Sequence, residues 1–327
     1  MNILSYSHAY VCGGHNGGAE TTLHDVMRLL REEKHKTTAL LSKPHPDGSG
    51  PYILDGVMVQ SFSSKRDPEL YIPDNDITLT QLECAARAGM LAEKAGKKSV
   101  QLIHNDQSYC IKSAGYNDAL IFNTEWVKPA YDHLSLPGVV FHPPIEPLRY
   151  KTETTREFIT IVNLTVGTEN RMSYNKGAET FYELARLFPD ERFLGVKGGY
   201  GEQYVPDDLP PNVTIMEHTN NPIDYLSRTK ILLCPSRYES YGRSAIEASA
   251  SGIPSLCTRT PGTLEGVGRY QTTIEGFHLF EWARGLRYLL DREVYQWFSK
   301  EAIQGCNSLW SRSGSEWADV LMLLESL

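Results

Sequence analysis

Residues 235–268 have the sequence PSRYESYGRSAIEASASGIPSLCTRTPGTLEGVG, and this stretch predicts a strand, a loop and a helix in succession. The apolar run KILLCPS at 230–236, which leads into it, is typical of a buried strand. A helix is expected from about Gly242 to Ala250, because Ser251-Gly252 ends it and Pro254 prevents its continuation. The strand-loop-helix order indicates one unit of an α/β fold.

Two glutamates, Glu239 and Glu247, flank the expected start of this helix. A loop that opens a helix with glycine presents backbone N–H groups and the positive end of the helix dipole, which suits phosphate. Glu239 precedes the helix and can accept hydrogen bonds from ligand hydroxyls. Glu247 lies more than one turn inside the helix and can reach a ribose diol. The pair therefore predicts a nucleotide-sugar site.

The same block resembles the donor site of family 4 glycosyltransferases, which are retaining enzymes of the GT-B fold. The shared pattern has two glutamates separated by seven residues, an aromatic-glycine pair after the first, and a small-Gly-aliphatic-Pro turn. The matching residues are Glu239, Tyr241, Gly242, Glu247, Ala248, Gly252 and Pro254. The resemblance implies an α/β protein with two Rossmann-like domains that face each other across a cleft.

Composition is consistent with a soluble globular protein of two domains. The chain has 327 residues and 41% apolar residues, without an apolar run of the roughly 20 residues that a membrane helix needs. The start, MNILSYSHAYV, lacks the features of a signal peptide. The six cysteines are scattered without a CxxC pair, which predicts reduced thiols and a cytoplasmic location.

The charge balance argues against a broad nucleic-acid or membrane surface. Residues 1–148 carry 13 basic and 17 acidic side chains, which leaves 19 of 32 basic and 23 of 40 acidic side chains for residues 149–327. Both halves are therefore mildly acidic, and neither has the electrostatic footprint that anionic polymers or lipids attract. The sequence carries no signal for an oligomeric state.

Strands alternate with helices along the whole chain, so we expect two tandem α/β units. The predicted division is 1–148 for an N-terminal, acceptor-side Rossmann-like domain and 149–310 for a nucleotide-sugar domain. Helices are expected at Leu82–Ala95 and Glu125–His133, and three more near the C-terminus at 277–291, 292–304 and 314–326. The resemblance implies that the last segment, 311–327, crosses back to the first domain.

Glycines of the first domain stand where a ligand phosphate could approach the backbone. The loop Gly13–Glu20 follows a predicted strand, but it lacks the GxGxxG fingerprint of a dinucleotide site. The resemblance implies that Gly17 and Gly18 touch the donor diphosphate and border the acceptor. It also implies that His104, at the end of the strand SVQLIH, contacts the donor sugar. The alternative for the glycine loop is a plain tight turn, and the alternative for His104 is a purely structural histidine.

Cations for the leaving diphosphate are expected in the second domain. Lys176-Gly177 matches the family pattern, whereas the usual arginine is missing, because the chain has Val162-Asn163-Leu164-Thr165 where Val-Gly-Arg-Leu is expected. Arg171 in the following loop is one candidate for that cation. Arg243 is another, with a solvated arginine at the helix start as its alternative. The backbone of Tyr241–Ser244, including Gly242 and Ser244, is expected to help bind the donor.

Asp74-Asn75-Asp76 imitates the DxD metal motif of the other glycosyltransferase fold, but it precedes the predicted strand DITLTQ. We expect no metal and no cofactor, since GT-B enzymes use cationic side chains and helix dipoles in place of a divalent ion.

The resulting hypothesis is a retaining hexosyl- or pentosyltransferase that uses a nucleoside-diphosphate sugar, with a UDP-sugar expected. Glu239, Lys176 and His104 are the predicted catalytic residues. The acceptor hydroxyl is expected on a saccharide, a lipid or a small molecule, and a hydroxylated DNA base is the less favoured option. A nucleotide-sugar-binding protein or an epimerase of the same fold, without transfer activity, is the alternative.

Overall fold

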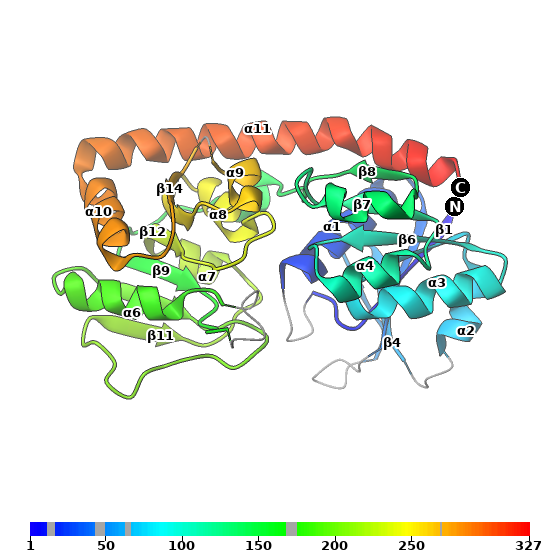
Figure 1. The fold of residues 1–327 in the computed structure, drawn as a ribbon, viewed down its shortest axis with the longest axis horizontal. Coiled ribbons are helices and arrows are strands. Elements are labelled where there is room, and N and C mark those ends of the chain that lie inside the picture. The colour runs from blue at the N-terminus through cyan, green and yellow to red at the C-terminus, as the bar shows by residue number, and fades with distance from the viewer. Residues whose placement is uncertain (12–16, 43–49, 63–66, 168–174, 269) are drawn as a thin grey trace. The chain divides into compact units, whose positions relative to one another are not determined.

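The fold is known from a computed structural model, which describes residues 1–11, 17–42, 50–62, 67–167, 175–268 and 270–327. Contacts divide the chain into two compact units. The first comprises Met1–Pro144 together with Arg312–Leu327, and the second comprises Ile145–Ser311 (Figure 1).

In the described part of the first unit, an eight-stranded sheet has the order β3-β4-β2-β1-β5-β6-β7-β8. All neighbours are parallel except β3 and β4, which form an antiparallel hairpin that the sequence did not predict. Its strands are β1 Asn2–Ser7, β2 Lys36–Leu41, β3 Tyr52–Leu54, β4 Val57–Ser61, β5 Ile77–Gln81, β6 Lys98–Ile103, β7 Ala119–Phe122 and β8 Gly138–Val140.

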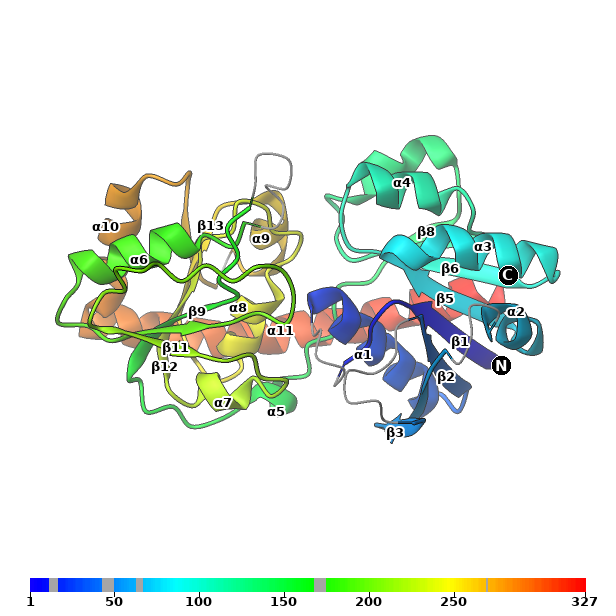
Figure 2. The ribbon, with the colours of Figure 1, turned by 90° about the horizontal axis from the view of Figure 1, so that it is seen from below.

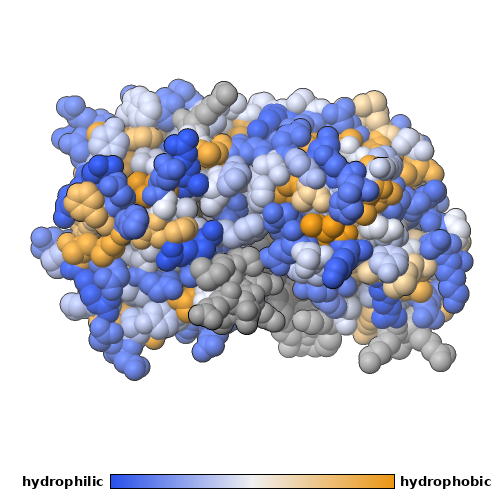
Figure 3. Space-filling view, viewed as in Figure 1, coloured by the Kyte–Doolittle hydropathy of each residue, from blue (hydrophilic) through white to orange (hydrophobic). Residues whose placement is uncertain are grey.

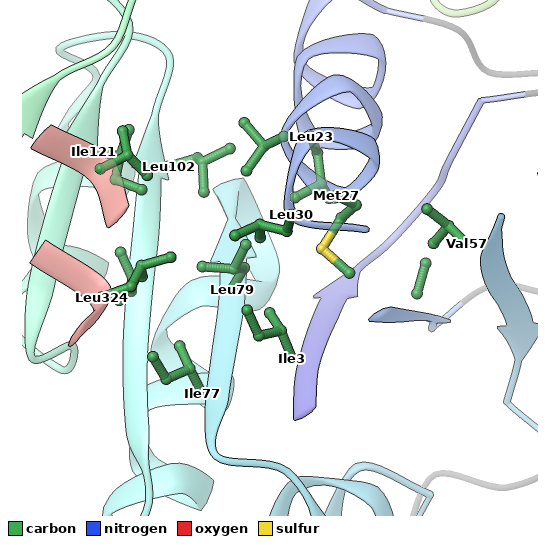
Figure 4. Packing of buried hydrophobic residues seen from close by; sticks show 14 of the residues in the cluster. Ile3, Leu23, Met27, Leu30, Val57, Ile77, Leu79, Leu102, Ile121 and Leu324 are labelled. Atoms are coloured by element: carbon green, nitrogen blue, oxygen red, sulfur yellow. The ribbon is translucent and has the colours of Figure 1, made fainter. Parts of the chain in front are cut away.

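Different helices cover the two faces of this sheet (Figures 1 and 2). Helix α1, Gly18–Glu32, places Leu23, Met27 and Leu30 over Ile3 and the neighbouring strands (Figure 4). The other helices of the unit are α2 Asp67–Tyr71, α3 Ala85–Lys94 and α4 Ser108–Ala114, with 3₁₀ helices at Ile72–Asp74, Leu82–Cys84 and Lys128–Leu134. Where a helix was predicted at Glu125–His133, the structure has a 3₁₀ helix that begins later, at Lys128, and ends at Leu134. Helix α3 confirms most of the helix predicted at Leu82–Ala95.

The second unit has a fully parallel six-stranded sheet among its described residues, in the order β11-β10-β9-β12-β13-β14. The strands are β9 Phe158–Val162, β10 Phe193–Val196, β11 Val213–Met216, β12 Thr229–Cys234, β13 Ser255–Thr258 and β14 Thr272–Ile274. The helices are α5 Pro147–Tyr150, α6 Ala178–Leu187, α7 Ile223–Leu226, α8 Arg243–Ser249, α9 Pro261–Gly266, α10 Leu279–Leu290 and α11 Arg292–Glu325.

Alternation of side chains along the strands builds two cores, one on each face of this sheet. Ile159 and Ile161 of β9 pack with α6 and α10, whereas Phe158 packs with α8 on the opposite face. Because both faces are buried, the strands have nearly continuous apolar sequences, as in KILLC. The sheet therefore presents its carboxyl edge, where the loops after β9 and β12 begin, for ligand binding.

The C-terminal region differs from the prediction of separate helices at 292–304 and 314–326. Helix α11 runs without interruption over 34 residues. Its residues up to Ser311 belong to the second unit, and those from Arg312 onward belong to the first. There Trp317 packs against Phe141, with ring centroids 5.3 Å apart, and Glu316 accepts a hydrogen bond from the backbone N–H of His142 at 2.9 Å.

Figure 3 shows apolar side chains at the surface over α6 and α10. Leu187 of α6 and Phe280 of α10 are among the exposed large hydrophobic residues. No helix within the described residues is both long and apolar enough to span a membrane.

Candidate functional site

The candidate site is built on the loop that connects β12 to α8 in the second unit. Strand β12 lies between β9 and β13, and the chain then passes through Pro235–Gly242 before α8 begins. Gly242 has φ +82°, a left-handed conformation that glycine adopts without steric cost, and it directly precedes the helix. The strand and helix predicted for this block are therefore confirmed, with the helix one residue shorter at each end.

Lys176 and Glu239 form an ion pair at the carboxyl edge of the sheet. The Lys176 Nζ lies 2.8 Å from Glu239 Oε2, and the two side chains are 22% and 20% exposed. Glu239 also accepts a hydrogen bond from the backbone N–H of Gly242 at 3.4 Å. Two residues predicted separately from sequence are thus brought into direct contact.

The backbone around Lys176 is fixed by its two neighbours. Asn175 accepts a hydrogen bond from the N–H of Gly177 through its side chain at 2.7 Å, and another from the N–H of Arg237 through its carbonyl at 2.9 Å. Gly177 has φ +79°, and an added Cβ would lie 2.3 Å from the carbonyl oxygen of Pro235. The Lys-Gly pair therefore lets the loop after β9 approach the loop after β12.

The pair shifts the pKa of both partners in the direction that keeps them charged. Burial by itself would raise the pKa of Glu239, but the Lys176 ammonium, together with hydrogen bonds from Gly242 and Ser236, outweighs burial, and the pKa lies below its ordinary value. Burial by itself would lower the pKa of Lys176, and the Glu239 carboxylate again prevails, so the pKa is raised. Lys176 is therefore a fully protonated cation at neutral pH.

Helix α9 supports the loop that carries Glu239, and this role was missed in the sequence. Pro261 and Gly262 begin α9, with Thr260 as its N-cap, at a place where no helix was predicted from the sequence. The Thr260 hydroxyl donates to the carbonyl of Glu239 at 3.0 Å. A Cβ on Gly262 would lie 2.3 Å from the Ser240 carbonyl group, so only glycine allows this close approach. Thr-Pro-Gly, with proline at the first helical position, is the signal that could have predicted it.

Arg243 is buried and paired, so the alternative of a solvated arginine at the helix start is wrong. Its Nε donates to Glu247 Oε1 at 2.7 Å, and its Nη2 donates to the Tyr150 hydroxyl at 2.9 Å. The side chains of Arg243 and Glu247 are 9% and 10% exposed. The predicted contact of Arg243 with phosphate stays a prediction, and Tyr150 is a partner that sequence reasoning missed.

The position of the absent family arginine is occupied by a core residue. Leu164 is fully buried, and Asn163 before it has φ +73°, the left-handed region that asparagine tolerates better than most residues. This explains why asparagine can stand where glycine is usual. Arg171 lies outside the described residues, so its predicted role stays a prediction.

Other predicted donor contacts in the second unit lie close to this pair. Tyr241 is buried in the core under α8. Ser244 lies in the first turn of α8, and the Ser244 Oγ is 3.8 Å from Cys234 Sγ. Together with Gly242, these residues form the start of the helix that follows the Glu239 loop.

The predicted residues of the first unit lie at the ends of its strands and helices. Gly17 is the N-cap of α1, and its N–H donates to Glu20 Oε2 at 3.0 Å; Gly18 is the first helical residue. His104 follows β6 and is buried, with its Nε2 2.8 Å from Gln81 Oε1. Residues 12–16 of the glycine-rich loop lie outside the described residues. The roles proposed for Gly17, Gly18 and His104 stay predictions.

The DxD-like segment has a structural use. Asp76 Oδ2 accepts a hydrogen bond from the N–H of Asn2 at 2.7 Å and so fastens the start of β1, while Asp74 ends a 3₁₀ helix. Across the described residues there is no group of three or more His, Cys, Asp or Glu side chains that could hold a metal ion.

Comparisons with known proteins concern the family of the second unit and the fold of the whole chain. Residues 163–304 match the family model for glycosyl transferases group 1. The chain is 33% identical over 89 residues to the D-inositol 3-phosphate glycosyltransferase of Pseudarthrobacter chlorophenolicus, which covers 26% of this chain and 21% of that protein. It is 29% identical over 62 residues to the capsular polysaccharide biosynthesis glycosyltransferase CapM of Staphylococcus aureus, covering 19% of this chain and 16% of that protein. The matches thus span about a fifth of these relatives.

Solved structures match over the whole chain. HepE of Anabaena in complex with UDP-glucose has a TM-score of 0.78 at 16% identity, with full coverage of both chains. Sucrose-phosphate synthase of Thermosynechococcus elongatus has a TM-score of 0.75 at 11% identity, again with full coverage of both. The predicted GT-B fold is confirmed, and the match of the second unit to a glycosyltransferase family agrees with the predicted enzyme class.

Proposed function

We propose that this chain, a GT-B glycosyltransferase by fold and by the family of its second unit, moves a sugar from a nucleoside-diphosphate sugar to an acceptor hydroxyl with retention of configuration. The observation that carries the proposal is the Lys176–Glu239 ion pair at the carboxyl edge of a parallel sheet, where such folds bind ligands. The complexes of HepE with UDP and with UDP-glucose support a UDP-sugar as donor.

The chemical task is to break the anomeric C–O bond, which leaves negative charge on the departing diphosphate. Lys176 supplies a fixed cation for that charge, and the backbone of Tyr241–Ser244 adds N–H groups. Fixed groups aimed at developing charge stabilise a transition state more than a mobile solvent does. Glu239 accepts hydrogen bonds from sugar hydroxyls, and Glu247 accepts them from the ribose.

The acceptor attacks the same face of the sugar that the diphosphate leaves, and its hydroxyl proton passes to a phosphate oxygen. In this scheme the bond to the acceptor oxygen forms as the bond to the phosphate oxygen breaks. As the family resemblance implies, we assign to Gly17 and Gly18 the role of touching the donor diphosphate and bordering the acceptor, and to His104 the role of contacting the donor sugar. We propose a saccharide, a lipid or a small molecule as acceptor, because neither half of the chain has a basic excess.

The test is a screen of nucleoside-diphosphate sugars against the full chain, read by release of nucleoside diphosphate and by thermal stabilisation. NMR of the product gives the anomeric configuration, and an inverted product contradicts retention. The double variant Lys176→Ala/Glu239→Gln is the matched negative control. Donor binding without hydrolysis or transfer to any acceptor would instead favour a binding protein, and a changed sugar would favour an epimerase.

Metal independence is tested with the same assay in EDTA. Turnover is expected to persist because Lys176 neutralises the leaving group. Loss of turnover that Mg²⁺ or Mn²⁺ restores would contradict this part of the proposal and direct attention to Asp74 and Asp76.

A further inference from the structure

Arg243 occupies a position that is unfavourable for a cation unless it has a specific partner. It is the first residue of α8, and a positive charge there opposes the helix dipole. Its side chain is only 9% exposed, and a guanidinium buried without a counter-charge is strongly destabilising. The ion pair with Glu247, four residues later on the same helix face, removes both difficulties.

Tyr150 connects this ion pair to both ends of α8. Its hydroxyl accepts a hydrogen bond from Arg243 Nη2 at 2.9 Å at the start of the helix. Its carbonyl accepts one from Ser251 Oγ at 2.9 Å, just after the end of the helix. Ser251 Oγ in turn accepts a hydrogen bond from the N–H of Thr152 at 2.9 Å. Residues 150–152 therefore hold α8 at both ends, and the arginine cannot turn without breaking this connection.

The arrangement fixes one oxygen of the Glu247 carboxylate. A guanidinium is planar and donates in a fixed geometry, so a contact through Nε restricts the rotamer of the carboxylate that it meets. The Glu247 side chain is 10% exposed. The hydroxyl of Tyr225 stays protonated, because burial and the negative charge of Glu247 both raise the pKa of Tyr225. A side chain held in advance loses less freedom when a ligand binds.

We propose that Arg243, supported by Tyr150, is a positioning residue that orients the Glu247 carboxylate toward the ribose diol of a nucleoside diphosphate. The inference rests on the proposed function for the role of Glu247, and it goes further by assigning Arg243 to the carboxylate and not to phosphate. In this chain an arginine stands where the resembling family tends to have an aliphatic residue, so the orientation of Glu247 by Arg243 is a feature of this sequence.

The experiment measures binding of UDP and of 2′,3′-dideoxy-UDP to the full chain by calorimetry. Wild-type protein is expected to prefer UDP at least about ten-fold, the factor that corresponds to 1.4 kcal/mol. In Arg243→Leu the preference is expected to fall to about two-fold, because UDP affinity drops while dideoxy-UDP affinity changes little. Arg243→Lys keeps the charge but not the planar fork, and it should recover the preference only in part.

Two further variants keep the result interpretable. Tyr150→Phe removes only a hydroxyl and should also reduce the preference for UDP. It serves as the test variant if Arg243→Leu does not fold. Arg28→Leu is the matched control: Arg28 is 11% exposed and pairs with Glu32 at the same i,i+4 spacing, but in the first unit. Arg28→Leu should keep the wild-type preference.

The outcomes separate this inference from the proposed function. If folded Arg243→Leu or Tyr150→Phe weakens both ligands equally and keeps the preference, Arg243 is merely structural and the inference is overturned. If wild-type protein binds neither UDP nor GDP nor ADP, the proposed function fails first, and the inference fails with it.

Discussion

Replacement of Lys176 by alanine tests the proposed site most directly. The ammonium lies 2.8 Å from Glu239, and at an effective dielectric constant of roughly 20 two unit charges at that distance attract by about 6 kcal/mol before desolvation. Removal of one partner from a buried pair costs about 3–5 kcal/mol, because the remaining charge loses its counter-charge. Since both side chains are about one-fifth exposed, we expect Lys176→Ala to lower the free energy of unfolding by about 1–3 kcal/mol.

The effect on turnover has a different origin and is measured separately. The ammonium should interact more strongly with the departing diphosphate than with the bound donor, so both kcat and donor affinity should fall. A loss of about 3 kcal/mol in the transition state corresponds to a combined factor of roughly a hundred in kcat/KM. The assay is steady-state kinetics with the donor varied at saturating acceptor, together with urea unfolding at pH 7.

Two variants distinguish catalysis from stability. Lys176→Met/Glu239→Gln removes both charges, so it should regain most of the stability but none of the turnover. Lys230→Ala is the matched control, because Lys230 pairs with Glu191 at 2.9 Å with both side chains 27–28% exposed, at the opposite end of β12. It should lose stability on a similar scale and keep wild-type kinetics.

Unchanged kcat and KM in Lys176→Ala would exclude Lys176 from the site. An unchanged kcat with a raised KM would show instead that Lys176 binds the ground state and the transition state equally.

Two further predictions concern the loop that carries Glu239. Gly262→Ala should lower the free energy of unfolding by about 1–3 kcal/mol, since its Cβ would lie 2.3 Å from the Ser240 carbonyl group. Gly115→Ala is the control and should be nearly neutral, because the nearest atom would be 3.8 Å from its Cβ. Equal urea midpoints for the two variants would contradict the close approach of α9. Because the folded-state pKa of Glu239 is depressed, its charge stabilises the fold above the ordinary glutamate pKa of about 4.3, and this stabilisation is lost as the pH falls through the lower folded-state pKa. The melting temperature of wild-type protein should therefore exceed that of Glu239→Gln at pH 7 and converge on it toward pH 3, and a difference that does not depend on pH would exclude the pair with Lys176 as the cause.

Local signals in the sequence were sufficient for the elements next to the site. The apolar run 230–236, the helix after Gly242 and its end at Ser251-Gly252 depend on neighbouring residues, and the structure confirms them. The same kind of reasoning was wrong at the C-terminus, where separate helices were predicted at 292–304 and 314–326 and the structure has one helix, α11. Trp317, Val320 and Leu324 pack into the core of the first unit, and this burial outweighs the weak helix propensity of the preceding residues.

The residue types of the candidate site follow from the sequence, because the spacing of Glu239 and Glu247 and the Lys176-Gly177 pair are visible along the chain. Which side chains meet depends on the tertiary structure. Lys176 and Glu239 are 63 residues apart, and they pair because β9 and β12 are neighbours in the sheet, so that the loops after them leave the same edge. Arg243 and Tyr150 are 93 residues apart, and burial forces the guanidinium to find its partners across that distance. Strand order and burial depend on the whole fold, and no local pattern records them.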